Sequence, residues 1–408
     1  MAGANEGFAS LSESYLFPEV ARRIRTFQEK YPEKRVLKLS IGNTTEAITP
    51  TIARAMEDKV RSLSRTDTYS GYGDEQGECA LRTALSRHYL KEYGVSIDED
   101  DFFISDGSKS DAANIQQIFS NESIVAVQDP AYPVYVDSTV ALGRGGTLDQ
   151  STGRYSRIVY MPGKRGNGFV ASPPDVHADI IFLCFPNNPT GAVAGRRELE
   201  AFVEYAHREN AVIVFDSAYS DYIETEGIPH SIYQIDGAMD CAIEIGSFSK
   251  NAGFTGVRLG WAVVPKALKS DDGKAGLLHK LWLRRQSTFF NGASNIAQSG
   301  GIAALSDEGR MECLGLVGYY KENARIISEA LSSLGLSFTG GKDSPYLWLE
   351  CPDGLSSWEF FDHLLSKTGV AVTPGSGFGS CGEGYVRISS YGHRSDILEA
   401  VSSLKENL

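Results

Sequence analysis

The chain has 408 residues, enough for two to four domains at roughly 100–200 residues per domain. Its 39 Lys and Arg against 52 Asp and Glu give a net charge of −13, which argues against a nucleic-acid partner because such binding needs a basic patch. An apolar fraction of 42% is typical of a globular protein and excludes an extended disordered chain. The six cysteines include no C-x-x-C pair and the seven histidines show no ligand spacing, so we expect no metal site.

The cellular location is predicted from what the N-terminus and the apolar runs look like. Residues 1–10 have neither the basic nor the apolar region of a secretory signal. The apolar runs are far shorter than the roughly 20 residues that a membrane-spanning helix needs. We therefore expect a cytoplasmic protein without a membrane partner.

The first part of the chain alternates expected strands and helices. Residues 1–40 precede the first strand and are predicted to form an N-terminal arm. Near-continuous apolar runs of strand length follow at 123–128, 179–185 and 211–215, as is typical of parallel strands covered on both faces. Between the last two, residues 196–210 carry apolar side chains at helical spacing, which completes a strand–helix–strand unit.

The last part of the chain indicates a smaller α+β domain. A long amphipathic helix is expected over 315–334, and shorter elements follow it: strands at 345–350, 370–373 and 385–389, and helices at 358–365 and 395–408. We therefore predict an α/β fold whose large domain, residues 41–293, has a mainly parallel central sheet sandwiched by helices. Residues 294–408 form the small domain, and the arm, residues 1–40, packs with it.

Polar groups follow three of the expected strands at their carboxyl ends, where open α/β sheets bind ligands. These strands run into Asn187-Asn188-Pro189-Thr190-Gly191, Asp216-Ser217-Ala218-Tyr219 and Ser247-Phe248-Ser249-Lys250. A pyridoxal phosphate site needs such groups: an amine for a Schiff base, a carboxylate for the pyridine nitrogen, donors for the ring oxygen and hydroxyls for the phosphate. Arg258 adds a bidentate phosphate contact.

The order and spacing of these motifs, with Gly256-x-Arg258-x-Gly260 after them, resemble the fold-type I, class I/II aminotransferases, which depend on pyridoxal 5'-phosphate. Segments at 69–77, 105–111, 128–135, 290–294, 345–348 and 373–379 further resemble the LL-diaminopimelate aminotransferases of that family. This resemblance implies transfer of an amino group from L-glutamate to tetrahydrodipicolinate, which gives LL-2,6-diaminopimelate and 2-oxoglutarate for lysine and cell-wall biosynthesis.

Two alternatives stay open at this point. One is another class I/II aminotransferase, acting on aspartate, alanine or aromatic amino acids. The other is a catalytically silent relative that binds a partner or regulates transcription. The presence of Lys250, Asp216 and Arg387, together with the acidic charge, argues against the silent relative.

The resemblance assigns the cofactor contacts residue by residue. Lys250 would form the Schiff base and shuttle the proton, Asp216 would pair with the pyridine nitrogen, and Asn188 and Tyr219 would face the ring oxygen. Tyr132 would stack on the ring. The phosphate would be surrounded by Ser108, Lys109, Ser247, Ser249 and Arg258, and by Tyr72 of a partner subunit.

The resemblance also assigns the substrate contacts. Arg387 would bind the α-carboxylate through its planar fork. Glu75 from the partner subunit would meet the distal ammonium of diaminopimelate, although a solvated loop acid is the alternative for this residue. The other implied contacts are Tyr15, Gly42, Lys109, Tyr132, Asn188 and Asn291, with Tyr15 and Asn291 from the partner. A homodimer with shared active sites is therefore expected.

Two features depart from simple pattern matching. The family often has Asn where this chain has Gly246, which could loosen a neighbouring hydrogen bond. Residues 377–382 match G-x-G-x-x-G, but a strand and not a helix is expected after them. We interpret this segment as a Gly-rich loop near the substrate and not as a dinucleotide site.

Overall fold

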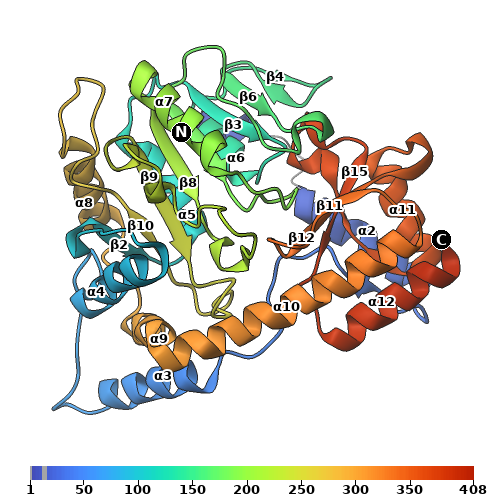
Figure 1. The fold of residues 1–408 in the computed structure, drawn as a ribbon, viewed down its shortest axis with the longest axis horizontal. Coiled ribbons are helices and arrows are strands. Elements are labelled where there is room, and N and C mark those ends of the chain that lie inside the picture. Colours follow the sequence, from blue (N-terminus) through green and yellow to red (C-terminus); the bar gives the residue numbers. More distant parts are fainter. Residues whose placement is uncertain (1, 12–15) are drawn as a thin grey trace.

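The computed structural model describes residues 2–11 and 16–408, and a seven-stranded sheet forms the centre of its larger part (Figure 1). Along the sheet the strands are β2 (Phe102–Ser105), β10 (Gly260–Val263), β9 (Ala242–Ser247), β8 (Val212–Asp216), β7 (Ile180–Cys184), β3 (Val125–Asp129) and β6 (Ile158–Pro162). β10 is antiparallel to both neighbours, and all other pairs are parallel.

Helices cover both faces of this sheet. The helices of this part are α3 (Pro50–Leu63), α4 (Cys79–His88), α5 (Ser108–Asn114), α6 (Val134–Ala141), α7 (Arg196–Glu209), α8 (Leu277–Phe289) and α9 (Asn295–Leu305), of which α3 packs mainly on α9. Successive residues of β7 enter opposite cores: Ile181 packs with Phe202 of α7, whereas Phe182 belongs to the core that contains Trp282 of α8. Burial on both faces explains why the central strands are continuous apolar runs.

The smaller part is built on an antiparallel sheet in the order β11 (Phe338–Gly340), β12 (Tyr346–Glu350), β15 (Tyr385–Ser389) and β14 (Thr373–Pro374). The helices α11 (Ser357–Thr368) and α12 (Arg394–Asn407) pack on it. α11 begins with a capping box between Ser356 and Glu359 and ends at Gly369, whose φ of 70° suits glycine. The remaining strands form two short pairs, β1 (Leu37–Lys38) with β13 (Val370–Ala371) and β4 (Leu148–Asp149) with β5 (Arg154–Tyr155).

The long helix α10 (Asp307–Ser333) connects the two parts (Figure 1). It starts earlier than the predicted residue 315 because the Ser306 hydroxyl accepts a hydrogen bond from the Gly309 amide at 3.1 Å and caps the helix there. Its first turns pack near α9 and α3, and its later turns pack on α12.

The N-terminal arm contacts both parts of the molecule. α2 (Leu16–Lys30) buries Leu16, Val20, Ile24 and Phe27 in the core of the smaller part. The short helix α1 (Glu6–Ala9) instead lies against α6 of the larger part, where the Tyr155 hydroxyl donates to the Ser10 carbonyl at 2.9 Å. The predicted α/β fold class is confirmed, while the domain bounds at 40 and 293 stay a prediction.

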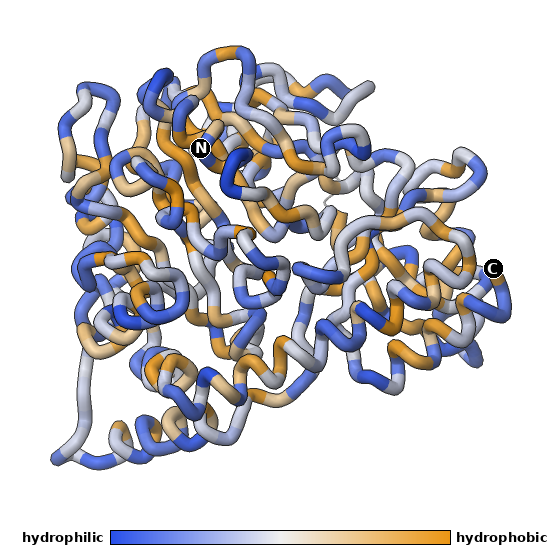
Figure 2. The backbone as a smooth tube through the Cα atoms, viewed as in Figure 1, coloured by the Kyte–Doolittle hydropathy of each residue, from blue (hydrophilic) through white to orange (hydrophobic). Residues whose placement is uncertain are grey.

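Hydropathy follows this architecture. Figure 2 shows hydrophobic residues gathered in the strands of both parts and hydrophilic residues along the outer helices and loops. Across residues 2–11 and 16–408, every helix is too short or too polar to span a bilayer.

Candidate active site

A cavity of about 250 Å³ lies where β7, β8 and β9 end, between the larger sheet and β12 and β15 of the smaller one. The cavity brings together most of the residues that the sequence singled out: Gly42, Ser108, Lys109, Tyr132, Asn188, Asp216, Tyr219, Ser247, Ser249, Lys250, Arg258 and Arg387. It is also lined by residues to which the sequence assigned no role, among them Tyr135, Cys184 and Tyr346.

Asp216, the last residue of β8, is a buried carboxylate at the floor of the cavity. Oδ2 accepts a hydrogen bond from the Tyr135 hydroxyl at 2.8 Å, and Oδ1 accepts one from the Ala218 amide at 3.0 Å. Burial raises the pKa of Asp216, although both donors oppose the rise. Among the described residues no lysine, arginine or histidine forms an ion pair with this carboxylate. The arrangement favours a cationic group of a ligand beside it.

Tyr135 is a site residue that sequence reasoning missed. It belongs to α6, and its ring stacks on Phe182 of β7 with centroids 4.9 Å apart. Its position three residues after Tyr132, in the segment that carries the family resemblance, was the only available signal. The fold brings α6 over the end of β8, and this packing places the hydroxyl on Asp216.

Lys250 follows β9 and directs its amine into the cavity, where Nζ donates to the Gly42 carbonyl. Burial, followed by the positive charges of Arg387 and Arg258, lowers the pKa of Lys250 from 10.5 to about 7. The ring of Tyr391 lies below the amine, with 5.3 Å from Nζ to the centroid. An amine with this pKa is about half neutral at pH 7, and its neutral form can act as a nucleophile or a base.

Arg387 of β15 is fully buried at the side of the cavity opposite the large sheet. Its two terminal nitrogens donate to Asn188 Oδ1 at 2.7 Å and to the Ser40 carbonyl at 2.8 Å. Within the part of the chain that the structure describes, its Nε has no hydrogen-bond partner. A buried guanidinium with an unused donor suits a carboxylate ligand.

Two tyrosines lie between Lys250 and Arg387. The hydroxyls of Tyr219 and Tyr346 are 2.9 Å apart, and the Tyr346 ring faces the Arg387 guanidinium at 4.4 Å. Burial raises the pKa of both phenols, so they act as neutral hydrogen-bonding groups. Tyr346 lies in segment 345–348, which carries part of the family resemblance, but the sequence predicted no role for it. Its contact with Tyr219 joins two parts of the fold that are distant in the chain.

The opposite end of the cavity is rich in donors for an anion. The Ser247 hydroxyl accepts from the Ser249 amide at 3.1 Å, and Arg258 lies 3.4 Å from the Ser249 hydroxyl. Gly107, with φ of 130°, precedes Ser108 and leaves room for Arg258, because a Cβ there would come within 2.2 Å of its NH2. Lys109 also borders this end.

Gly246 does not line the cavity, and its effect is therefore different from the one considered from sequence. A Cβ at this position would lie 2.1 Å from the indole of Trp261, which belongs to the core beneath β9. Trp261 in turn donates from Nε1 to the Tyr89 hydroxyl at 3.1 Å. In this chain a tryptophan fills the space beside the strand, so the residue at 246 has to be small.

Three predicted site residues lie away from this cavity. Tyr72 is 90% exposed, and Glu75 accepts a hydrogen bond from the Ser287 hydroxyl at 3.0 Å. Asn291 is exposed and precedes Gly292, whose Cα packs near the backbone of the Glu75 loop. Tyr15 lies outside the described residues.

The Gly-rich segment 377–382 forms turns and is followed by a strand, as expected for a loop and not for a dinucleotide-binding motif. Its two 3-10 turns, Gly375–Phe378 and Ser380–Gly382, lead into β15. The buried Asp129 at the end of β3 accepts hydrogen bonds from the Ser380 hydroxyl and the Cys381 amide, both at 3.0 Å. The Phe378 ring lies 5.0 Å from the Arg387 guanidinium, so this loop borders the carboxylate side of the cavity.

Comparison with known proteins agrees with this geometry. The family model described as "Aminotransferase class I and II" matches residues 34–152 and 164–404. The chain belongs to this family. It is 46% identical to the solved L,L-diaminopimelate aminotransferase from Chlamydomonas reinhardtii, with 99% of this chain and 98% of that chain covered and a TM-score of 0.93.

More distant structures share the aminotransferase's architecture. A substrate-bound BacF structure from Bacillus subtilis is 26% identical, covers 100% of this chain and 98% of that one, and gives a TM-score of 0.82. A Thermus thermophilus aspartate aminotransferase mutant is 21% identical over 100% of both chains, and its TM-score of 0.84 shows the shared fold alone.

This aminotransferase uses pyridoxal 5'-phosphate, as its family does. The donor set of the cavity fits that cofactor. Asp216 is a buried carboxylate held by the Tyr135 hydroxyl and the Ala218 amide, Lys250 offers an amine of lowered pKa, and Arg258 stands beside the serine hydroxyls at the anion-binding end. These three features match the ring nitrogen, the aldehyde carbon and the phosphate of the cofactor.

Proposed function

We propose that the protein is an LL-diaminopimelate aminotransferase, which moves an amino group from L-glutamate to tetrahydrodipicolinate and yields LL-2,6-diaminopimelate and 2-oxoglutarate. The observation that carries this proposal is the 46% identity to a solved L,L-diaminopimelate aminotransferase, over 99% of this chain and 98% of that one. The cavity supports it with a guanidinium for a substrate carboxylate and an amine for the proton transfer.

In the proposed mechanism the side chains hold the cofactor and move one proton. Asp216, fixed by Tyr135, keeps a proton on the ring nitrogen, and when bound the cofactor stores the electron pair released at the substrate Cα. In the first half of the reaction Lys250 would remove the proton from the Cα of glutamate, and in the second half it would return a proton to the Cα of the newly formed amino acid. Tyr219 would donate to the ring oxygen and Tyr132 would cover the ring face. The phosphate would be held by Ser108, Lys109, Ser247, Ser249 and Arg258, with Tyr72 of the partner subunit.

Arg387 orients the substrate through its α-carboxylate. The unpartnered Nε and the terminal nitrogens, which contact Asn188 and Ser40, are the donors for this carboxylate. The rings of Tyr346 and Phe378 lie against the guanidinium and keep water away from it. The low polarity around these rings strengthens the ion pair between Arg387 and the carboxylate. Asn188 and Gly42 border the same space.

The distal end of the substrate is proposed to be recognised by a second subunit. Glu75, Tyr72 and Asn291 do not line the chain's own cavity, and the loop of Glu75 lies beside Gly292, the residue after Asn291. Large apolar side chains in the same stretches of chain are exposed: Tyr69 is 67% exposed, Phe289 is 74% exposed and Leu281 is 39% exposed. These exposed side chains support a homodimer in which these loops and Tyr15 complete the neighbouring cavity. The cytoplasmic location stays a prediction of the sequence.

The decisive experiment compares amino donors with 2-oxoglutarate as acceptor. LL-diaminopimelate should be converted with a kcat/KM at least ten times that of aspartate, alanine or phenylalanine. Activity on aspartate or phenylalanine without activity on diaminopimelate would assign the chain to the alternative aminotransferases of the same family. A Lys250→Ala variant is the control for chemistry at this cavity, because it should lose activity on every donor.

A second experiment tests the role of Glu75. Glu75→Gln should raise the KM for LL-diaminopimelate at least tenfold and change the KM for glutamate little, because only diaminopimelate has a distal ammonium. Glu78→Gln, a nearby carboxylate that faces Lys59 at 4.0 Å, is the matched control. Equal losses for both substrates with Glu75→Gln would reduce Glu75 to a structural role.

A further inference from the structure

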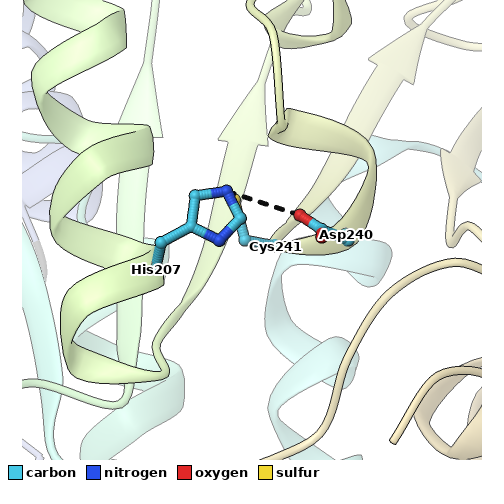
Figure 3. Close-up of side chains that lie close together, drawn as sticks. All are labelled: His207, Asp240 and Cys241. Atoms are coloured by element: carbon cyan, nitrogen blue, oxygen red, sulfur yellow. Dashed lines mark ion pairs between the residues drawn. The ribbon is translucent and has the colours of Figure 1, made fainter. Parts of the chain in front are cut away.

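A histidine, an aspartate and a cysteine meet at the start of β9, the end of the strand opposite to the one that lines the cofactor cavity (Figure 3). His207 belongs to the last turn of α7, and Asp240 and Cys241 directly precede β9. The three residues do not line the cavity described above. Because His207 and Asp240 are 33 positions apart in the sequence, no ligand spacing could show this cluster.

The donor atoms are spaced as ligands of one small cation. His207 Nε2, Asp240 Oδ1 and Cys241 Sγ all lie within 4.8 Å of one another, with 3.4 Å between Nε2 and Oδ1. The Gly237 carbonyl oxygen is 3.2 Å from Nε2 and 3.5 Å from Sγ, and offers a fourth donor. Around a tetrahedral zinc ion, donors at about 2.0–2.3 Å from the metal are roughly 3.3–3.8 Å apart. Separations of up to 4.8 Å exceed this range, so the side chains have to move closer together on binding the ion.

Asp240 directs a buried oxygen at the cluster. Its Oδ1 has no hydrogen-bond partner among the described residues, and its neighbour is His207 Nε2 at 3.4 Å, in the geometry of an ion pair. The other oxygen, Oδ2, is 2.5 Å from the Lys269 amine, and the Lys269 amide donates to the Asp240 carbonyl at 2.9 Å. Lys269 therefore fixes the carboxylate with Oδ1 directed at His207 and Cys241, as outer-shell partners do in metal sites.

Gly237 keeps the space between the ligands open. Its φ of 82° is in the left-handed region, and a Cβ there would come within 2.9 Å of His207 Nε2. Glycine at this position allows its carbonyl and the imidazole to approach the same point. The imidazole side of the cluster is accessible to solvent, because the His207 side chain is 41% exposed.

The chemistry of the donors selects the type of ion. Imidazole and thiol ligands favour zinc and related transition metals, whereas Mg²⁺ and Ca²⁺ require oxygen ligands. We infer that His207, Asp240 and Cys241, with the Gly237 carbonyl, form a binding site for a zinc(II)-type ion that joins the end of α7 to the start of β9. On binding, the Cys241 thiol loses its proton to solvent and its sulfur bonds to the metal.

Cobalt(II) is the probe that tests this site in the enzyme loaded with its cofactor. One equivalent of Co²⁺ per chain should produce the d–d bands of a tetrahedral site in the red, where pyridoxal phosphate does not absorb. Zn²⁺ should abolish the bands by competition and raise the melting temperature of the protein. Both effects should disappear in His207→Ala, which alters a helix turn that is exposed and is therefore expected to fold.

Matched variants make the result unambiguous. Asp240→Asn should also lose the bands, and Lys269→Gln should weaken Zn²⁺ binding about 10- to 100-fold by releasing Asp240. His363→Ala removes an exposed histidine of α11 outside the cluster and should bind Co²⁺ as the parent protein does. Absence of tetrahedral bands in the parent protein would overturn the inference. Bands that persist in His207→Ala would overturn it as well, because they would place the metal elsewhere.

Discussion

The hydrogen bond between Tyr135 and Asp216 gives the sharpest test of the proposed cofactor contacts. Tyr135→Phe removes one oxygen atom, the donor 2.8 Å from Asp216 Oδ2, and leaves the ring stacked on Phe182. Both residues are buried, so solvent cannot replace the donor. The Ala218 amide, 3.0 Å from Oδ1, then remains as the hydrogen-bond donor to the carboxylate.

The magnitude follows from the charge of the acceptor. A hydrogen bond to an ionised group contributes about 1.5–3 kcal/mol, which corresponds to roughly 10- to 150-fold in rate. Burial already raises the pKa of Asp216, and loss of a donor to the carboxylate raises it further. A protonated Asp216 cannot hold a proton on the ring nitrogen, so the loss should be larger at low pH than at high pH.

The assay is kcat/KM for LL-diaminopimelate and 2-oxoglutarate between pH 6 and pH 9, together with the affinity for the cofactor. Tyr205→Phe is the matched control, since its hydroxyl donates to the Val176 carbonyl at 2.6 Å on the outer helix α7. We expect the control to retain parent activity. If Tyr135→Phe stayed within threefold of the parent enzyme at every pH, the reasoning about Asp216 would be refuted.

Three further predictions concern the amine, the guanidinium and the replaced asparagine. The rate at which cofactor-free enzyme attaches the cofactor should increase as the pH rises through about 7, because burial lowers the pKa of Lys250 to that value and only the neutral amine attacks. Stopped-flow absorbance measures this rate. A pH profile of the rate with its midpoint near 10.5 would contradict the prediction. Arg387→Lys should lower kcat/KM by roughly 10- to 150-fold through loss of the fork, with the absorbance of bound cofactor retained; loss of the absorbance would assign Arg387 to cofactor binding. Gly246→Ala should lower the free energy of unfolding in urea by about 1–3 kcal/mol, because its Cβ would overlap the Trp261 indole. Gly166→Ala is the control and should lower it less, because a Cβ there would have no atom within 4 Å. Equal effects of the two substitutions would show that the indole moves aside to accept the Cβ.

Part of the site was predictable because it depends on where strands end. Asn188, Asp216 and Lys250 each follow an apolar run of strand length, and parallel strands present their carboxyl ends at one edge of a sheet. Once β7, β8 and β9 are neighbours, these side chains have to converge. The confirmed fold class and the shared cavity both follow from this local pattern.

Contacts between elements that are distant in the chain could not be predicted in the same way. Tyr346 reaches Tyr219 only because β12 of the smaller sheet faces the end of β8. From the sequence, the replacement of the family's usual Asn by Gly246 was expected to affect hydrogen bonds near the cofactor. In the structure the pleat of β9 turns Gly246 toward Trp261 in the core. Successive side chains of a strand point to opposite faces of the sheet. Which of the two faces meets the core beneath β9 is decided by the packing of the whole domain.

The acidic composition, the order of the strand-end motifs and the residue types of the cofactor site were determined by the sequence alone, because local patterns encode them. Only the tertiary structure decided that Tyr135 supports Asp216, that Arg387 keeps an unpartnered donor inside the cavity, and that His207 meets Cys241. Each of these is a distance between segments far apart in the chain. Such distances are fixed by burial of apolar surface from many residues at once, and no short motif records them.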